Sequence, residues 1–380
     1  MILIKRLLGT ACFVSLLHIL APAQNSLKLK YENSQVYAGI EVGSKGVKMS
    51  LLEIGKNAQS SGAFNILKDT SVNTDFISFN QNTYQNTLAG LSRLYDVAAK
   101  DYHIPTDRIF TVISSGVKIQ AEKDDKMNWV NQLIGAFRQN IGEPARDVPV
   151  IDVTEEARLS HLGIVPDARR YTTFLIDIGS GNTKGGYFPN GNIKDLKLFQ
   201  LTWGTKSTAN ESDKRCDTDK SLDNFHKQLN RVLQSAENNE IIYAVNESGS
   251  YPMSDNIAFS GGIAWSLATL MYPELIDNSV VPVTYEDLVK FNDRIYSNYS
   301  SVADSAILKT ITDNNVNKNT VSREVNRVNK VFDQRSLMAG TGLLLKIMRQ
   351  FEGVWEKKQF YLVKNGQVGW ISAYVDRHIK

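Results

Sequence analysis

The sequence predicts an α/β protein of two similar lobes that face each other across a central cleft. One short phrase occurs twice: Ile40–Lys48 reads IEVGSKGVK, and Ile176–Lys184 reads IDIGSGNTK, 136 residues later. Strand-like and helix-like patterns also alternate along the chain, which is typical of layered α/β domains. With 380 residues, of which 42% are hydrophobic and 22% charged, the chain is long enough to bury a sizeable core.

The first 23 residues have the pattern of a secretory signal peptide. Lys5 and Arg6 precede an apolar run over 7–20, and Ala-Pro-Ala at 21–23 offers small residues for cleavage. We therefore expect an exported protein, periplasmic or secreted, that is cleaved after Ala23 and continues with a linker over 24–35. The apolar run is too short for a membrane span and no longer one follows, so no transmembrane span is expected.

Charge and cysteine content exclude two other classes. Without the two leader cations, the 43 basic residues nearly balance the 40 acidic ones, so no basic field for nucleic acid exists and no nucleic-acid partner is expected. Cys216 is the only cysteine beyond the leader, which rules out an internal disulfide in the mature chain. A lipid anchor on Cys12 is disfavoured because apolar residues continue after it.

Each copy of the repeated phrase predicts a β-hairpin with a glycine turn. The strands expected for the two hairpins are Val36–Ile40 with Val47–Ile54, and Tyr171–Ile176 with Thr183–Phe188. The other expected elements are helices over 83–101, 126–139, 221–236 and 262–271, and strands over 108–113, 198–202 and 240–245. The polar segment 312–330 is expected to be a solvated helix or loop.

The hairpin tips combine residue types that suit a phosphate and a cation. Glycine lets backbone N–H groups approach a phosphate closely, and serine, threonine and lysine add side-chain donors. A carboxylate at the strand end would repel that phosphate unless a divalent cation lies between them. One such hairpin alone is best read as a plain tight turn, whereas two in register favour a site. Of the lysines near the tips, Lys45 is expected to face the cleft and Lys48 and Lys184 are less certain to do so.

The two phrases resemble the phosphate loops of the actin, sugar kinase and heat-shock chaperone ATPase superfamily. Val153–Gly163, VTEEARLSHLG, resembles the Glu-Glu-Ala-Arg-Leu helix start of the exopolyphosphatase/guanosine pentaphosphate phosphohydrolase (Ppx/GppA) family within it. Ala258–Gly262 and Met338–Leu343 resemble two later glycine motifs of that family. The resemblance implies two actin-like ATPase (ribonuclease H-like) lobes, lobe I over 36–157 and lobe II over 158–380, with a C-terminal segment that returns to lobe I.

The resemblance also implies an exopolyphosphatase-like hydrolase that uses Mg²⁺ or Mn²⁺ and attacks polyphosphate or a similar phosphate chain with water. Glu156 would activate the water from the start of a helix capped by Thr154, and Glu41 and Asp177 would hold the metal. A homodimer is a further expectation. The residues expected to bind phosphate are Gly43, Ser44, Lys45, Gly179, Ser180, Gly181, Asn182, Thr183, Lys206, Ser260, Gly261 and Gly262, with Lys118 and Glu155 as weaker candidates.

Two departures from the family pattern leave other functions open. Glu41 stands where the family has aspartate, and Lys118 is the only cation near the place of a phosphate-contacting arginine. One alternative is a catalytically inactive module that binds phosphate ligands or a partner. The other is an actin-like or sugar-kinase-like ATPase, against which the segment VTEEARL argues.

Overall fold

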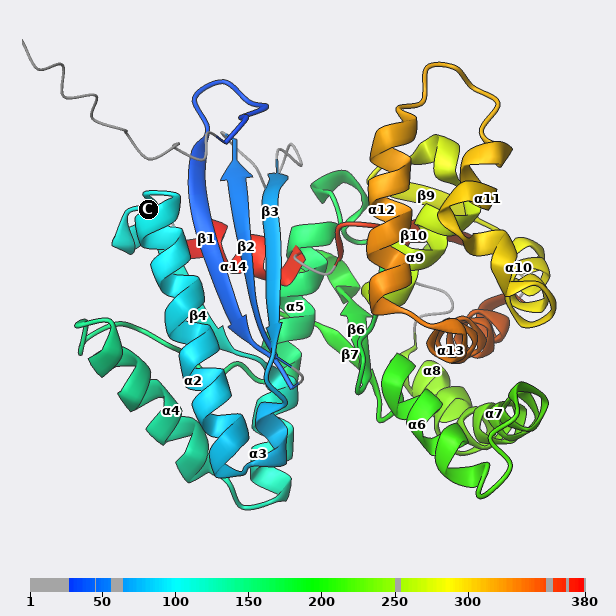
Figure 1. Ribbon diagram of the computed structural model, residues 1–380, viewed down its shortest axis with the longest axis horizontal. Coiled ribbons are helices and arrows are strands. Elements are labelled where there is room, and N and C mark those ends of the chain that lie inside the picture. The colour runs from blue at the N-terminus through cyan, green and yellow to red at the C-terminus, as the bar shows by residue number, and fades with distance from the viewer. Residues whose placement is uncertain are drawn as a thin grey trace, which may run out of the picture.

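The computed structural model describes residues 27–44, 46–55, 64–249, 254–352, 358–366 and 369–378. They form two α/β lobes side by side, each built on its own sheet (Figure 1). The predicted α/β class is therefore confirmed. The predicted signal peptide, the start of the linker and Lys45 lie outside the described residues. No helix within those ranges is long and apolar enough to cross a membrane.

The first lobe has a sheet of strand order β3-β2-β1-β4, in which β4 runs parallel to β1 and the other pairs are antiparallel. Helices α2 and α4 lie over one face of this sheet (Figure 1). Ile40 and Met49 of the strands share one buried cluster with Leu91 of α2 and Phe137 of α4. The bounds of the elements are β1 (Gln35–Val42), β2 (Gly46–Ile54), β3 (Phe64–Asn73), α2 (Gln81–Asp96), β4 (Ile109–Ile113), α3 (Ser115–Lys123) and α4 (Met127–Asn140).

The second lobe has a sheet of strand order β7-β6-β5-β8-β10-β9. The antiparallel hairpin β5–β6 corresponds to β1–β2 of the first lobe, and β8 runs parallel to β5 as β4 does to β1. The two sheets thus share the arrangement that the repeated phrase predicts. The strands are β5 (Thr173–Ile178), β6 (Thr183–Tyr187), β7 (Lys197–Leu201), β8 (Asn256–Ser260), β9 (Val280–Val283) and β10 (Gln359–Val363).

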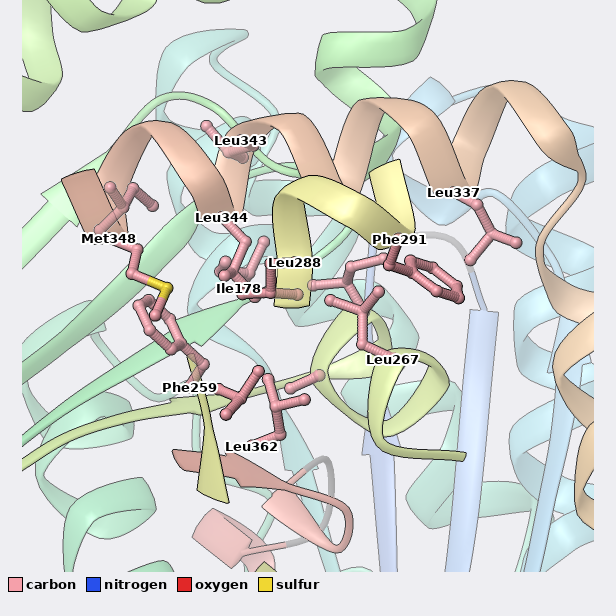
Figure 2. Close-up of a cluster of buried hydrophobic side chains, with 14 of the residues drawn as sticks. Ile178, Phe259, Leu267, Leu288, Phe291, Leu337, Leu343, Leu344, Met348 and Leu362 are labelled. Carbon is pink, nitrogen blue, oxygen red and sulfur yellow. The ribbon is translucent and has the colours of Figure 1, made fainter. Parts of the chain in front are cut away.

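Helices of the second lobe bury the largest hydrophobic cluster of the described residues against this sheet. Figure 2 shows Leu344 and Met348 beside Ile178 and Phe259, all of them fully buried or nearly so. The helices are α6 (Thr205–Arg215), α7 (Leu222–Ala236), α8 (Ile242–Ser248), α9 (Gly262–Met271), α10 (Tyr285–Ser297), α11 (Asp304–Thr310), α12 (Lys318–Val331) and α13 (Gln334–Glu352).

Two helices join the lobes on the other face of the first sheet. Helix α5 (Val153–Ile164) packs against α14 (Gly369–His378), and a side chain on Gly163 would lie 1.9 Å from the carbonyl oxygen of Gly369. Trp370 and Tyr374 of α14 share a buried cluster with Tyr37 of β1. The C-terminal helix α14 therefore lies against the sheet of the first lobe, and Figure 1 shows it in red behind β1 and β2.

Two local predictions are wrong. The segment 240–245 is helical rather than a strand, because Ile241 and Val245 are buried four residues apart while Tyr243 is exposed, which is a helical period. The cap of α5 is Asp152, whose side chain accepts the N–H of Glu155, and Thr154 lies within the helix. The other predicted strands and helices are present with ends shifted by a few residues.

Candidate active site

The two hairpin turns are closed in the same way. The N–H of Gly43 donates to the carbonyl oxygen of Gly46 at 2.8 Å, and the N–H of Gly179 donates to that of Asn182 at 3.0 Å. These two glycine amides therefore hold the turns together, and the phosphate-binding role of Gly43 and Gly179 stays a prediction. Within the described part of the chain, the amides of Ser44, Ser180 and Gly181 donate to no protein acceptor and remain available to a ligand.

The second turn rests on the first turn of α6. The amides of Thr205 and Lys206 donate to the carbonyl oxygens of Gly179 and Ser180 at 2.9 and 2.8 Å. The hydroxyl of Thr183 donates to the carbonyl oxygen of Trp203 at 2.7 Å, so its proton is already committed to the fold. The side chain of Lys206 is exposed and makes no ion pair within the described ranges. Thr183 thus supports the turn, while Lys206 stays a candidate for phosphate.

Each hairpin places a carboxylate directly opposite a lysine. Glu41 pairs with Lys48 in the register of β1 and β2, and Asp177 pairs with Lys184 in that of β5 and β6. Side chains directly opposite each other in an antiparallel pair share one face of the sheet. Lys48 and Lys184 therefore belong to the site, although the sequence prediction favoured Lys45. The signal for both lies in the repeated phrase, because its carboxylate and its last lysine lie opposite each other across the turn.

Glu156 connects the two lobes. It lies in the first turn of α5, with its carboxylate almost fully buried. Its Oε1 lies 2.6 Å from the Nζ of Lys184, and its Oε2 accepts the backbone N–H of Ser115 at 2.9 Å. Ser115 begins α3 in the first lobe, whereas Lys184 belongs to β6 in the second. One glutamate is thus held by a donor from each lobe.

Asp177 lies beside the same lysine. Its Oδ2 is 3.9 Å from the Nζ of Lys184, and its Oδ1 accepts the hydroxyl of Ser260 at 2.8 Å. Gly261 follows with φ +93, and a side chain there would lie 2.3 Å from the carbonyl oxygen of Ile178. The turn between β8 and α9 can therefore approach Asp177 only because this residue is glycine. Gly262 is the first residue of α9.

The ionisable groups of both hairpins act on one another. Burial raises the pKa of Glu41, with Lys48 opposing this rise and Glu156 and Asp177 adding to it. Burial likewise raises the pKa of Asp177, against the opposing effect of Lys184. The pKa of Glu41 in the first lobe is thus affected by carboxylates and a lysine of the second lobe and of α5, and a site shared by the two hairpin tips stays a prediction.

Glu156 and Lys184 form a charged pair. Burial alone would raise the pKa of Glu156, but the ammonium of Lys184 and the N–H of Ser115 lower it overall. Burial alone would lower the pKa of Lys184, but Glu156 and then Asp177 raise it overall. Both groups therefore stay ionised at neutral pH.

The residues do not fit the predicted divalent metal. Both oxygens of Glu156 already have donors, and Asp177 has the hydroxyl of Ser260 on one oxygen and Lys184 beside the other. A doubly charged ion beside Asp177 would also be repelled by the ammonium of Lys184, which lies 3.9 Å from that carboxylate. Among the described residues, no three His, Cys, Asp or Glu side chains are placed to hold a metal.

Two weaker candidates lie outside this cluster. Glu155 forms ion pairs with Arg158 on its own helix and with Arg377 of α14, the latter at 2.7 Å. Lys118 lies 3.9 Å from Glu122 on α3, and no contact with the carboxylate cluster is present in the described ranges. Both residues are more closely tied to helix packing than to the site. Lys45 lies outside the described residues.

No family model matches this sequence, and no curated protein does. Solved structures share its fold. An Aquifex aeolicus member of the Ppx/GppA protein family superposes with a TM-score of 0.60 at 15% identity, covering 91% of this chain and 99% of its own. An exopolyphosphatase from Cytophaga hutchinsonii gives 0.51 at 12% identity, covering 90% and 98%. The likeness to Ppx/GppA structures is confirmed at the level of the fold.

Proposed function

We propose that this protein is an exported, exopolyphosphatase-like hydrolase that binds the end of an anionic phosphate chain between its two hairpin turns and cleaves the terminal phosphoanhydride. The observation that carries the proposal is the placement of Glu156 between the lobes, 2.6 Å from Lys184 of the second hairpin and accepting the N–H of Ser115 of the first lobe, beside Asp177. The fold likeness to structures described as a Ppx/GppA phosphatase and an exopolyphosphatase supports it.

The turns supply the donors that a phosphate chain needs. The amides of Ser44, Ser180 and Gly181 are available, and the space beside Gly181 is open. Lys48 of the first hairpin and Lys206, which follows the second, add exposed positive charges. Donors from successive backbone amides form an anion-binding concavity, to which lysine adds point charges. A ligand held by both turns would bridge the lobes.

Glu156 is the residue that would orient the attacking water. It stays ionised, because Lys184 and the N–H of Ser115 stabilise its carboxylate. That stabilisation also makes it a weak base. Phosphoryl transfer tolerates a weak base, because its loose transition state depends mainly on positioning and charge stabilisation. A fixed carboxylate can therefore promote the reaction more by orienting the attacking water than by removing its proton.

The leader pattern in the first 23 residues supports placing this activity outside the cytosol. Hydrolysis requires only water as the second reactant. A kinase would need a nucleoside triphosphate that is not expected there. Location therefore favours a hydrolase over a sugar-kinase-like enzyme.

A binding module is the second candidate, and one observation favours it. Both oxygens of Glu156 accept protein donors, so water can reach only their remaining lone pairs. A carboxylate used in this way could serve only to hold α3, α5 and β6 together. The same turns would then capture a phosphate chain without cleaving it.

Phosphate release by the mature protein from long-chain polyphosphate, guanosine pentaphosphate and ATP tests these candidates. We expect Glu156→Gln to lose about 100-fold or more of the polyphosphate activity, the usual contribution of a positioned base. Glu155→Gln is the matched control, since its side chain lies outside the carboxylate cluster, and it should retain the wild-type rate. Equal rates in all three proteins would remove Glu156 from the mechanism. Polyphosphate binding without turnover would establish the module, and turnover of ATP alone would establish an actin-like ATPase.

A further inference from the structure

We propose that the ammonium of Lys184 takes the place of a divalent cation, so that the site binds its phosphate chain without a metal ion. This inference rests on the proposed function, because it concerns the same ligand. It gives Lys184 a role that the sequence prediction assigned to a metal held by Glu41 and Asp177.

The position of Lys184 carries the inference. Its Nζ lies 2.6 Å from Glu156 and 3.9 Å from Asp177, and only 10% of its side chain is exposed. These carboxylates come from α5 and β5, so the ammonium lies where two separate elements bring acidic groups together. A cation placed between these carboxylates in this protein must either displace Lys184 or accept its repulsion.

The chemistry of the ammonium suits this role. Lysine offers three N–H donors, of which one is directed at Glu156. Asp177 at 3.9 Å is beyond hydrogen-bonding distance, and the described residues supply no further acceptor, so among them two donors remain for water or a phosphate oxygen. Lysine is a common phosphate ligand as a compact point charge.

Lys48 provides a comparison within the same molecule. It holds the same register position opposite Glu41 as Lys184 holds opposite Asp177, yet it is exposed and has no ion pair within the described residues. A change at Lys48 removes a positive charge from the equivalent hairpin position without breaking an ion pair of the described residues. Lys48→Met is therefore the matched control for Lys184→Met.

Calorimetric titration of the full mature protein with long-chain polyphosphate, in EDTA and in Mg²⁺ at equal ionic strength, tests the inference. We expect dissociation constants within about threefold of each other, a difference of less than about 0.7 kcal/mol. Binding that weakens by about 30-fold or more in EDTA would overturn the inference and leave the proposed function standing. An absence of binding in both buffers would overturn the proposed function and this inference with it.

Mn²⁺ titration without polyphosphate, followed by electron paramagnetic resonance, gives a second and independent readout. Wild type and Lys48→Met should bind no stoichiometric Mn²⁺, whereas Lys184→Met should bind Mn²⁺ more tightly than either, because Glu156 and Asp177 then lose the ammonium that lies beside both of them. One equivalent of Mn²⁺ bound by wild type and lost in Asp177→Asn would contradict the inference. Since this last comparison needs no Lys184 variant, it decides the question even if Lys184→Met does not fold.

Discussion

Replacing Lys184 by methionine should strongly destabilise the protein, because it leaves Glu156 charged and buried without its partner. At 2.6 Å and an effective dielectric constant of about 20, the attraction between the two charges is about 6 kcal/mol before desolvation is counted. Removal of one member of a buried pair costs about 3–5 kcal/mol in measured cases. We expect Lys184→Met to lower the free energy of unfolding by about 3–5 kcal/mol.

A double-mutant cycle separates this pair from simple loss of packing. Glu156→Gln combined with Lys184→Met removes both charges and keeps similar side-chain volumes, so the double variant should regain most of the stability lost by Lys184→Met. Urea denaturation of the mature protein gives the four free energies, and Lys48→Met should lie within about 0.5 kcal/mol of wild type because its side chain is exposed. Single effects that add to within about 0.5 kcal/mol would refute the buried pair as described.

Three further predictions concern stability in other conditions and places. The pKa of Glu156 is lowered from 4.5, so the stability that its carboxylate contributes is present above pH 4.5 and is lost as the pH falls through the lowered pKa. The urea midpoint of the double variant of Glu156 and Lys184 should therefore fall less than that of wild type between neutral and acid pH. Gly261→Ala should cost about 2 kcal/mol or more in the same assay, because φ is +93 and the new Cβ would lie 2.3 Å from the carbonyl oxygen of Ile178; a loss below about 0.5 kcal/mol would contradict the geometry. Glu53→Gln should lower the free energy of unfolding by about 1–3 kcal/mol, because the carboxylate accepts hydrogen bonds from Lys30, Tyr31 and Ser34. A protease should then cut the segment that contains these three residues faster than in wild type.

The hairpins were the part of the fold that the sequence could predict best. Glycine turns between β-prone runs specify a hairpin locally, and their repetition 136 residues apart indicated two equivalent lobes. The segment 240–245 was predicted wrongly for a physical reason. Ile241, Ile242 and Val245 favour a strand by their β-branched side chains, but tertiary packing buries only the helical face of the segment.

The environment of the lysines could not be predicted from the repeated phrase. The phrase places Lys48 and Lys184 identically, and register alone puts each on the face of its carboxylate. Their burial depends on what packs against each hairpin, which is a tertiary property. The side chain of Lys184 is 10% exposed and Lys48 is exposed, although their local sequences match.

The difference between the two lysines follows from the single copy of α5. This helix brings Glu156 to the second hairpin and to the start of α3, and the sequence contains one VTEEARL segment for two hairpins. The second hairpin therefore has a cation fixed by two carboxylates, while the first has an exposed lysine that must pay conformational entropy to bind a ligand. A phosphate chain between them would meet one preorganised and one adaptable positive charge. Lys48→Met should therefore weaken polyphosphate binding mainly by slowing association, because it removes an exposed charge that attracts the polyanion and leaves the buried arrangement around Lys184 unchanged.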